Sequence, residues 1–262
     1  MKLRALLLLL LPLPALAQSE SYEKRPEVRG FIREMAKRHG FEESELTSLF
    51  ARVERAEPVL AAIRKPPEPP VWSAYRALFL TDRRIEGGLE FWQAHQGVLE
   101  RAEREFGVPV QVIVAIIGVE TFYGRYAGRW RVVDALTTLA FDYPARSPFF
   151  RSELEHYLLL SRDTGTDVFA VRGSYAGAIG IPQFMPSSTR RYAVDFDGSG
   201  TVDLRRSPSD AIGSVANFLK EHGWRSGEDV LFDAKPSGEA WRPLADGSVD
   251  PKHSLEDLRK AG

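Results

Sequence analysis

The most constraining feature of this sequence is an apolar run that ends in a single acidic residue. Residues 109–125 read PVQVIVAIIGVETFYGR, and Glu120 closes the apolar part. The run is too short and too interrupted to span a membrane, so it predicts a helix inside a globular protein. Apolar side chains cover nearly all sides of this helix, which predicts a central position in the fold.

Glu120 has the setting of a proton donor. Ile116 and Ile117 lie one helical turn before it, and the helix dipole disfavours negative charge near a helix C-terminus. Both effects raise the pKa of a carboxyl group. A carboxyl that stays protonated near neutral pH is the general acid that cleavage of a glycosidic bond requires. The alternative interpretation is a structural glutamate paired with an arginine across the core.

A second catalytic carboxylate is harder to find. Asp134 is expected to cap a helix, Asp142 precedes a turn, and Asp163 is expected in a loop. None of the three has apolar neighbours like those of Glu120. This asymmetry favours a mechanism with one protein carboxylate.

The N-terminus has the pattern of an export signal. Lys2 and Arg4 precede the unbroken apolar segment 6–11, and Ala15-Leu16-Ala17 has the small residues of a cleavage site. A membrane anchor would need about 20 apolar residues. We therefore expect residues 1–17 to be a cleaved signal peptide and the protein to be periplasmic or cell-wall associated, with no transmembrane segment after cleavage.

Cysteine content and charge exclude several classes of protein. The chain contains no cysteine, which excludes disulfides and argues against a lipoprotein; five histidines leave little for a zinc site. Removal of residues 1–17 takes away two basic residues and no acidic one, so the formal net charge changes from -1 to -3. That balance argues against a nucleic-acid partner.

Periodicity predicts a mainly α-helical protein. The expected helices are 31–39, 43–55, 58–64, 89–106, 109 to Gly124 or Gly128, 135–142, 148–161 and 210–221. The segment KPPEPP (65–70) predicts an extended connector, with a proline-rich docking motif as the alternative. After Trp224 the composition predicts irregular chain with short extended pieces.

The segment RGSYAGAIGIPQFMP (172–186) is rich in glycine. It lacks the Gly-Lys-Ser/Thr sequence of a phosphate-binding loop. We expect its glycines to let the backbone approach a carbohydrate-binding groove and to present Ser174, Tyr175 and Gln183 there. An ordinary surface loop is the alternative.

The segment DFDGSGTVDL (195–204) resembles a calcium loop. Its oxygen ligands at EF-hand positions 1, 3, 5, 7 and 9 would be Asp195, Asp197, Ser199, the Thr201 carbonyl and Asp203. Position 12 is Arg206 instead of glutamate, and Asp210 could supply the missing carboxylate from a longer loop. This predicts a calcium site of reduced affinity, with an Asp/Gly turn as the alternative.

Three segments together resemble one known family. They are GVETFYGR, SYAGAIGIPQFMPSS, and YAVDFDGSG followed by DAIGSVANFLKEHGW, and they are similar to the bacterial lytic murein transglycosylase B family over residues 31–224. The resemblance implies N-terminal accessory helices in 18–106 and a lysozyme-like helical catalytic core in 107–225, with the calcium loop at 195–210. Residues 226–262 resemble the start of a small β-rich segment, after which family members continue into a further helical segment.

The resemblance also implies a reaction. The substrate would be the peptidoglycan glycan strand, cleaved at the MurNAc-β-1,4-GlcNAc bond. One glutamate would act as acid and then as base, and the product would carry a 1,6-anhydro-MurNAc end. No cofactor would be needed for this chemistry. The alternatives are a muramidase-type hydrolase on the same fold, or a weakly active peptidoglycan-binding scaffold.

Finally, the resemblance assigns roles to individual residues. Glu120 matches the acid/base, and Ser174 and Gln183 match polar residues beside it. Tyr75 matches an aromatic residue of the groove, Arg146 a basic residue that meets a peptide or lactyl carboxylate. Phe149 and Phe218 stand where the family can carry tyrosine. The implied calcium ligands are Asp195, Asp197, Ser199, Thr201 and Asp210.

Overall fold

The computed structural model describes residues 21–64, 71–231, 233–245 and 252–262. The expected signal peptide 1–17 and the connector 65–70 lie outside these residues. The chain divides into two compact units, Met1–Trp224 and Arg225–Gly262. In the described ranges, no helix combines the length and the apolar character needed to cross a membrane.

The first unit is built almost entirely of helices. Its first half contains η1 (Tyr22–Lys24), α1 (Pro26–His39), α2 (Glu43–Phe50), α3 (Glu57–Arg64), α4 (Trp72–Phe79), α5 (Asp82–Ala94), α6 (Gln96–Phe106) and α7 (Val110–Thr121). Its second half contains β1 (Trp130–Arg131), α8 (Val132–Asp142), η2 (Pro144–Arg146), α9 (Ser147–Asp163), β2 (Arg172–Gly173), α10 (Pro186–Tyr192) and α11 (Pro208–Glu221). Strands β1 and β2 pair antiparallel. The mainly helical fold predicted from periodicity is confirmed.

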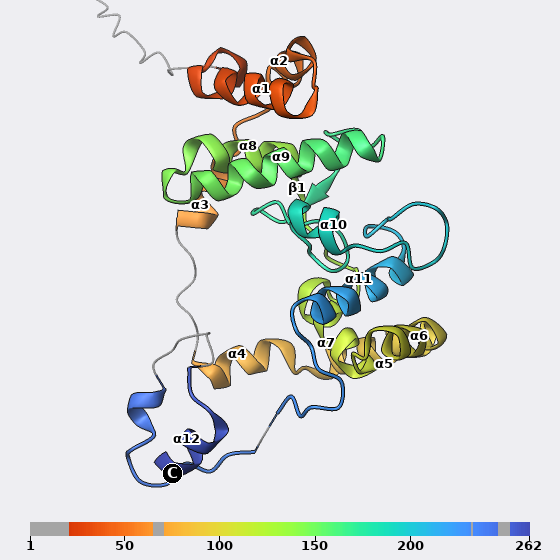
Figure 1. Cartoon of the computed structure of the whole chain (residues 1–262), viewed down its shortest axis with the longest axis vertical. Helices are drawn as coiled ribbons and strands as arrows, with labels where there is room; N and C mark the ends of the chain where they lie inside the picture. Colours follow the sequence, from red (N-terminus) through yellow and green to blue (C-terminus); the bar gives the residue numbers. More distant parts are fainter. Residues whose placement is uncertain (1–20, 65–70, 232, 246–251) are drawn as a thin grey trace, which may run out of the picture. The chain divides into compact units, whose positions relative to one another are not determined.

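This unit has two hydrophobic clusters. Helices α8 and α9 lie side by side and form one cluster with α1, α2 and α3 (Figure 1). Helices α5, α6, α7 and α11 form the other (Figure 1). The glycine-rich segment contributes Ile179 to the first cluster and Ile181 to the second. The segment expected to line a groove therefore joins the two clusters.

Two predicted helices are shorter than expected. The predicted helix 89–106 is broken at His95, whose φ of -122° and ψ of 21° separate α5 from α6. The His95 ring lies 4.6 Å from the Phe91 ring. The predicted helix 43–55 ends at Phe50. The apolar period continues through both breaks, so periodicity alone could not find them.

The ends of α7 and α8 also differ from expectation. Helix α7 does not run to Gly124 or Gly128, because Phe122 already adopts the left-handed conformation with a φ of 52°. Asp134 does not cap α8, which begins two residues earlier. Its carboxylate instead accepts hydrogen bonds from the Glu54 backbone N–H at 3.1 Å and from the Arg131 side chain.

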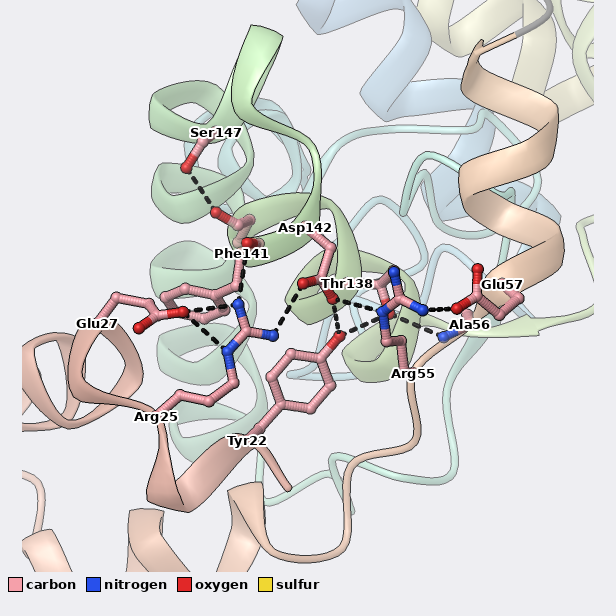
Figure 2. A network of polar contacts seen from close by, with 11 residues as sticks. Tyr22, Arg25, Glu27, Arg55, Ala56, Glu57, Thr138, Phe141, Asp142 and Ser147 are labelled. Carbon is pink, nitrogen blue, oxygen red and sulfur yellow. Dashed lines mark hydrogen bonds and ion pairs between the residues drawn. The ribbon is translucent and has the colours of Figure 1, made fainter. Parts of the chain in front are cut away.

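The N-terminal elements are fastened to α8 through Asp142 (Figure 2). Its carboxylate accepts hydrogen bonds from Tyr22 Oη at 2.6 Å, Arg25 Nη1 at 2.8 Å and Arg55 Nε at 3.1 Å. Burial raises the pKa of Asp142, but the hydrogen bonds from Tyr22 and Arg25 outweigh burial and hold this pKa below its ordinary value. The residue expected before a simple turn thus joins segments more than 80 positions apart.

The second unit, Arg225–Gly262, contains η3 (Arg242–Leu244) and α12 (Leu255–Ala261). Ser254 and Asp257 form a capping box at the start of α12. The described residues of 226–262 contain no strand, so the extended pieces expected there are not observed.

Candidate active site

Glu120 occupies the last turn of α7. Ile117 beside it is fully buried, but Val119 and Glu120 itself are exposed. The end of α7 is therefore partly open to solvent, whereas the sequence predicted a central helix. Within the described residues, Glu120 makes no hydrogen bond or ion pair, which excludes the alternative of a glutamate held by an arginine. Partial burial removes water from its carboxyl group and raises its pKa, as predicted.

The backbone after Glu120 is held in an uncommon conformation. Phe122 and Tyr123 both have positive φ, 52° and 61°, and neither is glycine. Such positions persist only where surrounding contacts impose them, and they cluster at functional sites. The Phe122 and Tyr123 backbone N–H groups donate to the Gly118 and Ile117 carbonyls at 3.1 and 3.3 Å. These bonds close the helix directly after the carboxylate.

Tyr123 sits in a slot between α5 and α7. Its hydroxyl donates to the Arg84 carbonyl at 2.9 Å, and Arg84 Nη1 donates to the Gly118 carbonyl at 2.5 Å. A Cβ atom at Gly88 would lie 2.7 Å from the Tyr123 hydroxyl, and one at Gly118 would lie 2.6 Å from it. Only glycine leaves room for this ring at both positions.

The glycine-rich loop meets the chain that follows Glu120. Thr121 Oγ1 donates to the Ile181 carbonyl at 2.7 Å. Gln183 Nε2 donates to the Ala127 carbonyl at 3.2 Å and to the Gly180 carbonyl at 2.9 Å. Gln183 has a φ of 52°, and among the described residues it is the third non-glycine residue with a positive φ. The loop and the chain segment after α7 are therefore joined by hydrogen bonds.

The other two loop residues differ in role. Ser174 Oγ accepts hydrogen bonds from the backbone N–H groups of Ala176 and Ala178 at 3.2 and 3.0 Å, so the serine shapes the loop. Its hydroxyl hydrogen stays free to donate. Tyr175 is exposed. Sequence reasoning had treated both as groove residues and had not foreseen the turn at Ser174.

The remaining predicted substrate contacts are scattered. The Tyr75 ring lies 5.0 Å from Phe79 on exposed α4. The Arg146 guanidinium lies 4.5 Å above the exposed ring of Phe149. Phe149 is 39% exposed. In the described part of the chain, no hydrogen bond, ion pair or ring contact joins these residues to Glu120.

Phe218 lies beside the end of the glycine-rich loop. Its ring is 5.2 Å from Phe184, which follows Gln183, and 5.3 Å from Tyr192. The His222 ring stacks on Phe218 at 3.9 Å. This aromatic group supports the end of the glycine-rich loop.

Other acidic residues considered as a second carboxylate are engaged elsewhere. Asp142 binds three side chains of the N-terminal region. Asp134 is paired with Arg131, and its pKa is raised by burial despite that arginine. Asp163 lies 3.3 Å from Arg162 and 3.5 Å from Arg190. Unlike these three aspartates, Glu120 has no hydrogen-bond or ion-pair partner in the described residues.

A second group of carboxylates forms at the predicted calcium loop. Asp195, Asp197 and Asp210 offer oxygens within 4.8 Å of one another, a donor set that fits a hard divalent cation. Asp210 is fully buried and accepts backbone N–H bonds from Phe196, Asp197 and Asp203 at 2.8, 3.2 and 2.8 Å. Asp210 therefore lies beside the two loop carboxylates.

The other residues of that loop behave differently. Asp203 turns its carboxylate to the backbone N–H groups of Arg205 and Arg206 at 2.9 and 3.2 Å. Ser199 Oγ donates to the Thr201 carbonyl at 3.1 Å. The converging carboxylates are therefore those of Asp195, Asp197 and Asp210, and the Asp203 carboxylate is not one of them.

Two residues at this site were missed from the sequence. Thr121 links α7 to the loop, and Tyr123 fixes the turn after Glu120. The pair Gly87-Gly88, which the structure places inside α5, was the available signal, because a glycine inside a helix can mark a packing contact.

Comparison with known proteins identifies relatives over most of the chain. The family described as "Transglycosylase SLT domain" matches residues 23–262. The Escherichia coli (strain K12) protein "Membrane-bound lytic murein transglycosylase B" is 41% identical over 251 residues, which are 92% of this chain and 68% of the relative.

Solved structures agree with this match. Soluble lytic transglycosylase SltB1 from Pseudomonas aeruginosa has 50% identity and a TM-score of 0.87, covering 90% of this chain and 80% of that one. Escherichia coli Slt35 in complex with calcium has 39% identity and a TM-score of 0.75, covering 88% and 77%. Pseudomonas aeruginosa SltB3 in complex with NAG-NAM-pentapeptide has 31% identity and a TM-score of 0.74, covering 86% and 59%.

These likenesses span both hydrophobic clusters and the segments that carry Glu120 and the glycine-rich loop. They agree with the resemblance that the three sequence motifs predicted. The chain therefore belongs to the lytic murein transglycosylase B family and is a lytic transglycosylase that acts on peptidoglycan.

Proposed function

We propose that this chain cleaves the MurNAc-β-1,4-GlcNAc bond and leaves a 1,6-anhydro-MurNAc end, with Glu120 as both acid and base. The observation that carries the proposal is a single unpaired carboxyl group with a raised pKa at the end of α7. A protonated carboxyl can protonate the leaving oxygen, which general acid catalysis requires.

The same carboxyl group, now ionised, then acts as a base. Once its proton has gone to the GlcNAc O4 atom, the Glu120 carboxylate takes the proton of the MurNAc C6 hydroxyl while O6 bonds to C1. The acetamido group of the sugar helps stabilise the charge at C1. Because the nucleophile belongs to the substrate, no second protein carboxylate is needed. The engagement of Asp134, Asp142 and Asp163 in other contacts supports this mechanism.

The strand would bind across the glycine-rich loop. Ser174 retains a free hydroxyl hydrogen, and Gln183 Oε1 makes no hydrogen bond in the described residues, so both have capacity for sugar groups. Exposed rings of Tyr75, Tyr175 and Phe149 and the Arg146 guanidinium would extend the contact. Phe218 would act by supporting Phe184.

The carboxylates of Asp195, Asp197 and Asp210 would hold a structural calcium ion, with Ser199 and the Thr201 carbonyl as further oxygen ligands. The calcium complex of the relative Slt35 supports this assignment. The ion would brace the loop between α10 and α11. None of the proposed proton transfers passes through it.

Export of the chain follows from the same function. The expected signal peptide 1–17 would deliver it to the periplasm or cell wall, where peptidoglycan lies.

Digestion of purified sacculi in H₂¹⁸O tests the reaction. We expect released muropeptides with anhydro ends and no ¹⁸O, because O6 of the substrate attacks C1. Reducing ends that carry one ¹⁸O would instead identify a muramidase-type hydrolase. A chain that binds sacculi and releases nothing would be a scaffold.

A further inference from the structure

A basic cavity lies apart from the residues assigned above. It has a volume of about 520 Å³ and lies where the loop before α3 meets the β1–β2 pair and the start of α8. Four arginines line it: Arg55, Arg129, Arg131 and Arg172. Trp130 adds an aromatic surface, and the only acidic lining residues are Glu54 and Asp134.

Two of these arginines are neutralised within the protein. Arg131 pairs with Asp134 and lies 3.2 Å from Glu54. Arg55 pairs with Glu57 and lies 3.1 Å from Asp142 (Figure 2). Their charges are therefore already balanced by carboxylates.

The other two are not neutralised. The Arg129 guanidinium lies 4.9 Å above the Trp130 ring, and Arg172 Nη1 donates to the Arg129 carbonyl at 2.8 Å. Throughout the described ranges, neither guanidinium forms an ion pair with a carboxylate. Both side chains are nevertheless held in place, Arg129 by a ring and Arg172 by a backbone carbonyl.

The strand register brings a third charge close. Arg131 and Arg172 are direct partners across the antiparallel pair β1–β2. Directly opposite residues place their side chains on the same face, where like charges destabilise the pairing. Glu54 and Asp134 balance the charge of Arg131, but no carboxylate of the described residues pairs with Arg172 beside it. An anion bound from solution would supply this missing counter-charge.

We propose that Arg129 and Arg172 bind a carboxylate of the peptide that peptidoglycan carries on its glycan strand. The inference rests on the proposed function and adds to it a recognition site for the peptide. Guanidinium groups match a carboxylate in shape and charge, and Trp130 offers a surface for the apolar part of a peptide.

The position of the cavity suits this ligand. Ala127, which binds Gln183, precedes Arg129 by two residues, and Ser174 follows Arg172 by two. On both chain segments, the arginines of the pocket are thus close in sequence to residues of the loop proposed to bind the sugars. The complex of SltB3 with NAG-NAM-pentapeptide supplies a relative whose ligand carries a peptide with a terminal carboxylate.

Binding to insoluble sacculi tests the proposal, with Glu120→Gln in every variant to prevent cleavage. The double variant Arg129→Ala/Arg172→Ala is compared with Arg33→Ala/Arg104→Ala, which removes two exposed arginines from α1 and α6. The probes are intact sacculi and sacculi stripped of peptides by an amidase. We expect the first variant to bind intact sacculi about tenfold more weakly, a loss of about 1.4 kcal/mol, and stripped sacculi with unchanged affinity.

Other results would overturn the proposal. Unchanged binding of intact sacculi would show that Arg129 and Arg172 form no binding site. An equal loss of affinity for both probes would show that the peptide is not the ligand. A second measurement covers a folding defect: Arg172→Gln should leave Tm nearly unchanged, because Arg172 is exposed and has no carboxylate partner in the described residues. A lowered Tm with unchanged binding would make Arg172 purely structural. Failure of the proposed cleavage would appear separately, as absent muropeptide release with Glu120 intact.

Discussion

At the scale of single residues, the protein treats its carboxyl groups in two opposite ways. Asp142 receives three side-chain hydrogen bonds, which hold its pKa low, whereas Glu120 receives none within the described residues and its pKa is raised by lost hydration. The sequence predicted which of the two would be the acid, from its apolar neighbours. It could not predict that Glu120 is exposed, because exposure depends on helices distant in sequence.

The raised pKa of Glu120 predicts the pH dependence of cleavage. The proton-donating form is lost as pH rises through this pKa, so kcat/KM should fall on the alkaline side with a midpoint above the ordinary glutamate value of about 4.3. Initial rates on soluble muropeptides between pH 4 and 8 would locate the midpoint. A midpoint at or below the ordinary value would contradict the assignment of Glu120 as acid.

At the scale of elements, the contact between α5 and α7 fixes the turn that follows Glu120. We expect Gly88→Ala to cost about 1–3 kcal/mol of stability, because the added methyl would meet the Tyr123 hydroxyl 2.7 Å away. Tyr123→Phe removes that oxygen, so adding it to Gly88→Ala should recover part of the loss. Urea unfolding of the two single variants and the double variant would measure this coupling.

Gly97→Ala in α6 is the matched control. No atom lies within 4 Å of a Cβ atom placed there, so this substitution should stabilise the helix by about 0.5–1 kcal/mol. Strictly additive losses for Gly88→Ala and Tyr123→Phe would show that the hydroxyl does not fill the slot.

Periodicity predicted the existence of most helices better than their ends. The predicted helix 148–161 is observed within α9, and the predicted helix 210–221 within α11, which Ser207 caps by accepting the Asp210 N–H at 3.1 Å. The break at His95 and the end of α7 at Phe122 were missed. Contacts with α5 through the Tyr123 slot impose the end of α7, and a local sequence pattern cannot predict such contacts.

The calcium loop gives a second prediction for an element. A calcium concentration of about 100 times Kd should stabilise the protein by about 2.7 kcal/mol and raise Tm by roughly 5–10 °C. Asp195→Asn should abolish this rise, because it removes one of three converging carboxylates. Thermal unfolding with calcium, magnesium and chelator would check it; an equal calcium response in the variant would exclude the site.

At the scale of the first unit, the N-terminal elements depend on a polar connection to α8. Asp142→Asn should cost about 2–4 kcal/mol, because Arg25 and Arg55 would lose a carboxylate that is 12% exposed (Figure 2). Since the pKa of Asp142 is lowered by folding, its contribution is present above the ordinary aspartate value of about 3.9 and is lost as pH falls through the lowered pKa.

Thermal unfolding of both proteins between pH 2 and 7 would measure this effect. The difference in Tm should be largest near pH 6 and shrink in acid. Asp82→Asn, an exposed acid in the first turn of α5, is the control and should change stability by less than about 1 kcal/mol. A difference that persists unchanged at low pH would contradict the role of the Asp142 charge.

The central claim is that one carboxyl group, that of Glu120, performs both proton transfers. Its most direct test compares Glu120→Gln with Glu105→Gln, an exposed glutamate on α6, in release of muropeptides from sacculi. We expect Glu120→Gln to lower the rate by at least about 10³-fold with unchanged Tm and sacculus binding, and Glu105→Gln to behave as the unmodified protein. Release by Glu120→Gln at the unmodified rate would contradict the claim.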